Sequence, residues 1–202
     1  MERRVIMVKG LMVLLLLLSP YIGLAQHNPT DFAVKSLSTQ NSGMYVLGGW
    51  AVTNIAVGAY GWAKYGNSTQ YFHQMNLMWN VVNLSIAGFA LYNNAQLDVL
   101  SMSSSEALDF HRKTERILLI NSALDIAYIG SGFLLRHLSS TRANSKDILK
   151  GYGNSLILQG GFLLVFDLVL YQTLRLQRLS FTDGISLTAN GDAIGLRFSH
   201  FF

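Results

Sequence analysis

The sequence contains no cysteine among its 202 residues. This absence excludes a disulfide framework, a thiolate metal site and a cysteine nucleophile. Charged residues are also scarce, because they make up 13% of the chain against roughly 25% of an ordinary soluble domain. Half of the residues are hydrophobic, so the composition excludes an intrinsically disordered chain and argues against a soluble globular protein.

Motifs that carry catalytic chemistry are missing as well. The chain has no P-loop, no GxSxG, no HExxH and no Rossmann glycine pattern. We therefore expect no enzymatic activity, no cofactor and no bound metal. The formal net charge of +4 comes from basic residues that never cluster beyond pairs, so we expect no nucleic-acid partner.

The N-terminal segment has the pattern of a signal peptide. A basic start is followed by an apolar run over residues 11–18 and by a small-residue motif at residues 23–25. The pattern predicts a signal peptide over residues 1–25, cleaved before Gln26. The alternative is an uncleaved segment that forms a fifth span.

Four further stretches are long and apolar enough to cross a bilayer. They are residues 43–62, 72–92, 117–135 and 151–174. A helix needs about 20 residues to cross the hydrocarbon core, and only Asp125 and Asp167 bring charge into these spans. We expect an all-α membrane protein, a four-transmembrane-helix bundle formed by residues 26–178. A soluble bundle of hydrophobic helices is the alternative.

The polar segment before the third span is expected to be helical and solvated. Ser103 and Glu106 have the spacing of a capping box, which places the start of a helix near Ser104. That helix would add polar turns over residues 106–116 outside the bilayer. His111 lies in these turns, and we expect it to be exposed to solvent.

The C-terminal tail, residues 179–202, changes from helical spacing to alternation. Asn190-Gly191 is a strong hairpin signal. The tail is therefore predicted to form a short β-hairpin, in which a two-residue turn would pair Leu187 with Ile194 and Ile185 with Leu196.

The signal peptide also sets the expected orientation. Its removal leaves the new N-terminus outside, and four spans return the C-terminus to the same side. We expect a multi-pass protein of the bacterial inner (cytoplasmic) membrane, with both mature termini on the periplasmic side. Loop charges do not decide the matter, since five basic residues would lie inside and seven outside.

Each span carries a stripe of polar and small residues at steps of three and four, which places the stripe on one helix face. The stripes are Trp50, Asn54, Gly58 and Gly61; His73, Asn76, Asn80 and Asn83; Asn121, Asp125, Tyr128 and Gly132; Gly153, Gly160, Asp167 and Tyr171. Polar groups that face lipid are costly, so the stripes are expected to face one another. Small residues allow the helices to approach closely.

Counting turns from the outer end of each span places Asn54, Asn83, Asp125 and Asp167 in one layer, with no Lys or Arg at that depth. Two interpretations stay open. The polar groups could hold the helices together by hydrogen bonds. They could instead bind a proton, a cation or a small polar ligand, because carboxylates inside a membrane are candidate functional sites. The candidate site residues are Asp125, Asp167, Asn54, Asn83, Asn80 and Asn76.

The segments GGWAVTNIAVGAYGW, HQMNLMWNVVNLSIAGFALY, LDIAYIGSGF and SLILQGGFLLVFDLVLY resemble those of uncharacterised bacterial four-span integral membrane protein families, domains of unknown function. The resemblance covers roughly residues 40–175. It implies a four-span fold and no particular activity. We expect a structural or complex-partner component with the lipid bilayer, a second copy or another membrane protein as partner. The alternative is a small transporter or sensor.

Overall fold

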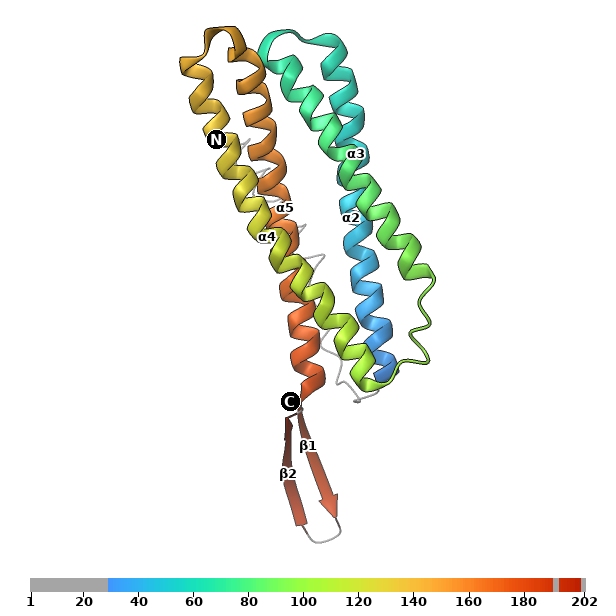
Figure 1. The fold of residues 1–202 in the computed structure, drawn as a ribbon. Helices are drawn as coiled ribbons and strands as arrows, with labels where there is room; N and C mark the ends of the chain where they lie inside the picture. Colours follow the sequence, from blue (N-terminus) through green and yellow to red (C-terminus); the bar gives the residue numbers. More distant parts are fainter. Residues whose placement is uncertain (1–28, 191–192, 201–202) are drawn as a thin grey trace, which may run out of the picture.

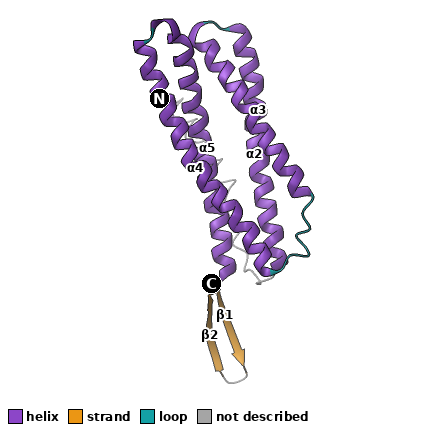
Figure 2. Ribbon diagram, viewed as in Figure 1, coloured by secondary structure: helices purple, strands orange, loops and turns teal. Residues whose placement is uncertain are grey.

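A computed structural model describes residues 29–190 and 193–200, with side chains for residues 29–182. The expected signal peptide lies outside the described residues. The elements are α2 (Pro29–Lys64), α3 (Asn67–Ala95), α4 (Ser104–Thr141), a 3₁₀ turn η1 (Ala143–Ser145), α5 (Lys146–Thr182), β1 (Asp183–Asn190) and β2 (Ala193–His200). Figure 1 shows the helices as long, steeply inclined rods, and Figure 2 shows that they make up most of the described chain.

The helices form two hairpins, α2 with α3 and α4 with α5, and the hairpins meet mainly where α3 packs against α5. Helices α2 and α4 run in one direction, and α3 and α5 run in the other (Figure 1). We call the end at which α5 meets β1 the strand end of the bundle. Helices α2 and α4 also begin there (Figure 1).

The prediction of an all-helical domain with four long helices is confirmed, and each expected span lies within one helix. Helix α2 has 36 residues, α4 has 38 and α5 has 37. At about 1.5 Å per residue these helices are roughly 55 Å long, which exceeds the hydrocarbon core of about 30 Å. The extra length lies mostly at the strand end, ahead of the expected spans in α2 and α4.

The start of α4 agrees with the sequence analysis. The Ser103 side chain accepts a hydrogen bond from the Glu106 backbone, and the Glu106 carboxylate accepts one from the Ser103 backbone. The predicted capping box is therefore confirmed. The carboxylate accepts hydrogen bonds from both the backbone N–H and the hydroxyl of Ser103, and these bonds lower the pKa of the exposed Glu106 carboxyl group.

Close helix contacts are made at glycines. A Cβ atom at Gly132 would lie 2.7 Å from the carbonyl oxygen of Gly153, and one at Gly153 would lie 2.6 Å from the carbonyl oxygen of Gly132. Gly61 packs in the same way against the ring of His73 on α3. Only glycine allows backbones to approach this closely, so the predicted role of small residues in these spans is confirmed.

The interior of the bundle is unusually polar. Asn76, Asn80, Gln159 and His111 are among its most completely buried large side chains. Large apolar side chains are exposed along the helices instead, among them Tyr45, Val52, Phe89, Ile126 and Val165. Ordinary soluble domains bury their apolar residues and expose their charges, so this distribution is inverted over much of the bundle.

The interior also contains two apolar clusters. Near the strand end, Phe32, Ala33, Val99 and Ala107 form one cluster with neighbouring half-buried side chains. Leu118, Leu170 and Leu174 form a second cluster between α4 and α5.

Two helical segments are long and apolar enough to cross a membrane by length and composition alone. They are Ser104–Thr141 and Ala143–Thr182. Only 22% and 39% of their most apolar windows are buried inside the protein. Most of that apolar surface is therefore not covered by the described residues.

Strands β1 and β2 follow α5 and pair antiparallel. They extend away from the bundle (Figure 1). The expected register is wrong: Leu187 pairs with Leu196 and Ile185 pairs with Phe198. The observed register differs from the expected one by two residues. Because the alternation of a strand has a period of two residues, the hydrophobic pattern fits both registers equally well and cannot distinguish them.

Candidate functional site

A chain of neutral side chains links three helices in the middle of the bundle. Trp50 donates its indole N–H to the Oε1 atom of Gln159 at 3.0 Å. The Gln159 side chain donates to Oδ1 of Asn76, and Asn76 donates to Oδ1 of Asn54 at 2.9 Å. Asn54 returns a hydrogen bond to the carbonyl oxygen of Trp50 at 2.8 Å. The contacts close a ring that joins α2, α3 and α5.

The chain continues along α3. Asn83 donates to Oδ1 of Asn80 at 3.3 Å, and Asn80 donates to the carbonyl oxygen of Asn76 at 2.7 Å. We call these six residues, Trp50, Asn54, Asn76, Asn80, Asn83 and Gln159, the amide chain. The structure thus brings together all four asparagines among the candidate site residues. The sequence analysis did not identify Gln159, although this residue directly precedes Gly160, a member of the fourth stripe.

The two intramembrane carboxyl groups of the sequence analysis form a separate pair. Asp125 on α4 and Asp167 on α5 lie within hydrogen-bonding reach of each other. Their exposed fractions are 2% and 4%. The Oδ2 atom of Asp125 is buried and has no hydrogen-bond partner. The expectation that both carboxyl groups face the interior at a similar depth is therefore confirmed.

The expected common layer of Asn54 with the carboxyl pair is wrong. Asn54 is linked through Asn76 to Gln159, and Asp167 follows Gln159 by eight residues on α5. Eight residues correspond to about 12 Å of helix rise. Within residues 29–182, no hydrogen bond joins an asparagine to either carboxyl group.

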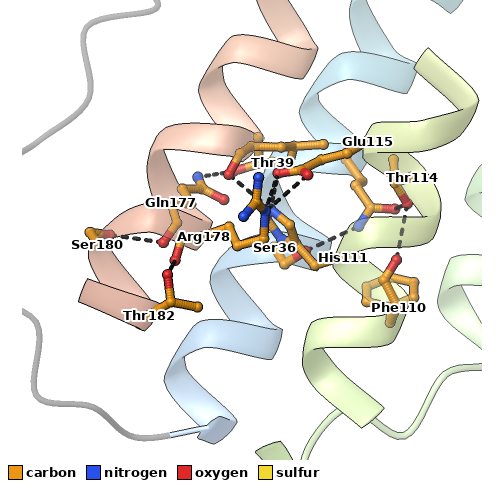
Figure 3. A network of polar contacts seen from close by, with 12 residues as sticks. Ser36, Thr39, Phe110, His111, Thr114, Glu115, Gln177, Arg178, Ser180 and Thr182 are labelled. Atoms are coloured by element: carbon orange, nitrogen blue, oxygen red, sulfur yellow. Dashed lines mark hydrogen bonds and ion pairs between the residues drawn. The ribbon is translucent and has the colours of Figure 1, made fainter. Parts of the chain in front are cut away.

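A third set of polar contacts lies at the strand end (Figure 3). Arg178 on α5 donates its Nε–H to both carboxylate oxygens of Glu115 on α4, at 3.0 and 2.9 Å. The carboxylate is nearly buried, whereas the arginine side chain is 21% exposed. An ion pair in this position keeps a charge inside the bundle that would be costly without its partner.

His111 lies at the centre of this set and is fully buried. Its Nδ1 atom is 2.8 Å from the hydroxyl of Ser36 on α2, and its Nε2 atom is 2.8 Å from the carbonyl oxygen of Leu174 on α5. The expectation that His111 is exposed is therefore wrong. One face of the helical turns around it packs against α2 and α5, whereas Arg112 and Lys113 on the other face are exposed.

Further side chains connect α2 to the same region. Gln40 donates to Ser36 at 3.1 Å and accepts from Thr114 at 3.0 Å. Gln177 donates to Thr39 at 2.7 Å. We call the eight residues Ser36, Thr39, Gln40, His111, Thr114, Glu115, Gln177 and Arg178 the clamp cluster. Figure 3 labels seven of them, all but Gln40, and shows that these seven come from α2, α4 and α5 and point toward one another.

The clamp cluster and the carboxyl pair are separated by an apolar layer. Along α5, Leu170 and Leu174 lie between Asp167 and Arg178, and Leu118 lies between Asp125 and Glu115 on α4. These leucines are buried against one another. An apolar layer of leucines therefore separates the clamp cluster from the carboxyl pair.

The site contains no grouping suited to a metal ion: within the described residues, no three His, Asp or Glu side chains come together. What the arrangement can do chemically is to hydrogen-bond helices to one another and, at the carboxyl pair, to hold a proton or a small cation.

Comparison with known protein families gives a match. The model of a family of unknown function, DUF6992, matches residues 46–168. No curated protein and no solved structure matches the chain. The matched residues include all six candidate site residues, whereas Ser36 and Arg178 of the clamp cluster lie outside the match.

Proposed function

The chain belongs to DUF6992, a family of unknown function, and we propose that it is an integral membrane protein of four transmembrane helices followed by a short C-terminal β-hairpin. Its role is structural, as a stable helical component or as the partner of another membrane protein, and it is not an enzyme. Its location is the bacterial inner membrane, with both ends of the mature chain on the periplasmic side.

The observation that carries this proposal is the inverted polarity of the bundle. Amide and carboxyl side chains fill its middle, whereas large apolar side chains such as Tyr45, Phe89 and Val165 are exposed. Exposed apolar surface on this scale is unfavourable in water. In a bilayer the same arrangement is favourable, because lipid covers the apolar faces and the polar groups hydrogen-bond inside.

The ends of the expected spans add support. Lys64 closes α2 and lies over the rings of Tyr60 and Tyr65. At the same end of the bundle, Tyr71 and Tyr152 contact each other edge to face. Tyrosine and basic residues gather at membrane–water interfaces. This end of the helices is therefore suited to the headgroup region.

The amide chain supports a structural role. Its side chains donate to and accept from one another, so each amide finds hydrogen-bond partners inside the bundle without a ligand. Interhelical hydrogen bonds of this kind contribute about 0.6 kcal/mol each in membrane proteins. The amide chain therefore holds α2, α3 and α5 together inside the bundle.

Membrane extraction and reporter fusions test the proposal. The protein should stay in the membrane pellet after alkaline carbonate treatment, and purified protein should start at Gln26. A phosphatase reporter fused after Phe202 should be active. Release into the carbonate supernatant would contradict membrane integration, and an active cytoplasmic reporter at Phe202 would contradict the orientation.

Substitution of uncovered glycines tests whether the protein associates with a partner or with a second copy. Gly49, Gly88 and Gly130 have open space around them in the described structure. If the protein associates through such a face, Gly49→Leu should reduce crosslinking to the partner or to a second copy without unfolding the monomer. Unchanged crosslinking would exclude the α2 face.

The carboxyl pair supports a second candidate function, a transporter or sensor that binds a proton or a small cation. The specific observation is the buried Oδ2 atom of Asp125, which has no partner. Infrared spectra of wild type should show a protonated carboxyl band that disappears in Asp125→Asn or in Asp167→Asn. Activity or binding that survives both substitutions would leave only the structural role.

A further inference from the structure

The first observation is that His111 joins three helices through one ring. Helix α2 otherwise packs mainly on α3, and its contacts with α4 and α5 are far less extensive. At the strand end, the imidazole bridges this gap by contacting Ser36 on α2 and Leu174 on α5. The ring also lies 4.8 Å from that of Phe32 on α2.

The contacts determine the tautomer of the buried ring. The Leu174 carbonyl can only accept a hydrogen bond, and so can the Glu115 carboxylate 3.5 Å from the same Nε2 atom. Nε2 must therefore carry hydrogen. In the neutral ring Nδ1 then has none, so it accepts a hydrogen bond from the Ser36 hydroxyl.

Protonation of the ring would reverse this hydrogen bond. Nδ1 would become a donor, and the Ser36 oxygen, which already accepts from Gln40, would have to accept from both. The Ser36 proton would lose its acceptor inside a buried site. A buried hydroxyl without an acceptor destabilises the contact that holds it.

The charges around the ring affect the protonation of His111. Glu115 lies on the same helix as His111, and Arg178 faces it from α5. Among the described residues, the groups that α2 contributes to this contact are uncharged: Phe32 and Ser36 touch the ring, and Gln40 donates to Ser36. Since Glu115 is already paired with Arg178, a protonated His111 would give the clamp cluster a net positive charge inside the bundle.

We propose that His111 is a pH-sensitive latch, whose protonation releases the first turns of α2 from α4 and α5 at the strand end. The rest of α2 stays on α3, held by the amide chain and by the hydrogen bond from Asn94 to Asn41 at 2.7 Å. Low pH thus separates α2 from α4 on the strand-end side of the apolar layer of Leu118, Leu170 and Leu174.

The environment keeps the latch closed near neutral pH. His111 lies six residues before the expected third span, and burial is the main cause that lowers the pKa of its imidazole. A lowered pKa in the folded state means that the unfolded or opened form binds a proton more readily. Closure is therefore fully favoured above the ordinary histidine pKa of about 6.5 and is lost as pH falls below it.

Distance measurements between spin labels test the latch in the full chain, reconstituted in lipid nanodiscs. The absence of cysteine allows labelling at Lys35→Cys on α2 and Arg112→Cys on α4, both at exposed positions. The distance should shift to longer values between about pH 7.5 and about pH 5. A control pair, Lys64→Cys and Lys150→Cys at the opposite end, should not change.

Two variants assign the shift to the ring. His111→Gln can donate to Leu174 and accept from Ser36 but cannot titrate, so its label distance should stay short at both pH values. Ser36→Ala keeps His111 but removes its partner, so its distance should be long already at neutral pH. An unchanged wild-type distance at low pH, an equal shift in His111→Gln, or a wild-type profile in Ser36→Ala would each overturn the proposal.

Discussion

The amide chain and the clamp cluster are both buried, yet they use different chemical groups. The amide chain consists of neutral side chains that lie within the expected spans. The clamp cluster lies just before those spans in α2 and α4 and contains an ion pair, Glu115 with Arg178. The two networks should therefore differ in how much free energy of unfolding is lost when a contact is removed. Loss of a neutral hydrogen bond costs far less than loss of the partner of a buried charge.

The largest effect is expected from Arg178→Ala. The substitution leaves the Glu115 carboxylate buried without a partner, and such losses cost about 3–5 kcal/mol. Because Arg178 is partly exposed, we expect the lower value, about 3 kcal/mol, in the free energy of unfolding measured by circular dichroism in mixed micelles. The exposed neighbour Arg175→Ala is the control. Equal losses in both variants would show that the ion pair has no special weight.

The next effect separates packing from polarity. A Cβ at Gly160 would lie 2.9 Å from Ile129 and 3.0 Å from the carbonyl oxygen of Asp125, whereas Gly161 has nothing within 4 Å. Gly160→Leu should therefore destabilise the bundle by about 1–3 kcal/mol through overpacking, and Gly161→Leu should have little effect. Similar unfolding curves for the two variants would mean that α4 and α5 are not in close contact there.

A smaller loss is expected within the amide chain. Asn76→Ala removes the side-chain hydrogen bonds to Asn54 and Gln159. At about 0.6 kcal/mol for each bond the total is about 1 kcal/mol. The same unfolding assay measures the loss, with the exposed Asn93→Ala as control. A loss as large as that of Arg178→Ala would remove the contrast between the two networks.

The smallest effect is expected from Asp125→Asn. An amide can still hydrogen-bond to Asp167, so the unfolding free energy should change by no more than about 0.6 kcal/mol. Asp125→Leu leaves Asp167 without this partner and should be more destabilising. If Asp125→Asn is the worse variant, the carboxyl group itself is required, which would favour a bound proton or cation.

Much of the amide chain and the carboxyl pair could be predicted from the sequence. Asn76, Asn80 and Asn83 stand at helical spacing in an otherwise apolar stretch, so the polar face is obvious. The partners could not be derived, because helix rise alone does not fix the vertical shift between helices. For this reason Asn54 was expected beside the carboxyl pair, although it contacts Asn76 instead.

The clamp cluster was missed for a physical reason. His111 and Glu115 lie in a segment rich in charge, and a charged segment is usually solvated. A signal was nevertheless present, since Ser36 and Gln40 on α2 and His111 and Glu115 on α4 are each spaced by four residues. Polar pairs at this spacing share one helix face. Because the helices extend beyond the expected spans, such faces have other helices to pack against.

Accessibility of single cysteines tests the central claim, that the bundle crosses a membrane with its apolar faces in lipid. The chain has no native cysteine, so each position can be labelled alone with a membrane-impermeant maleimide in intact cells and in vesicles of opposite orientation. Lys35→Cys and Arg112→Cys should react from one side, Lys64→Cys and Lys150→Cys from the other, and Val52→Cys and Ile126→Cys only after detergent is added. Rapid labelling of positions 52 and 126 without detergent, or labelling of positions 35 and 64 from the same side, would contradict it.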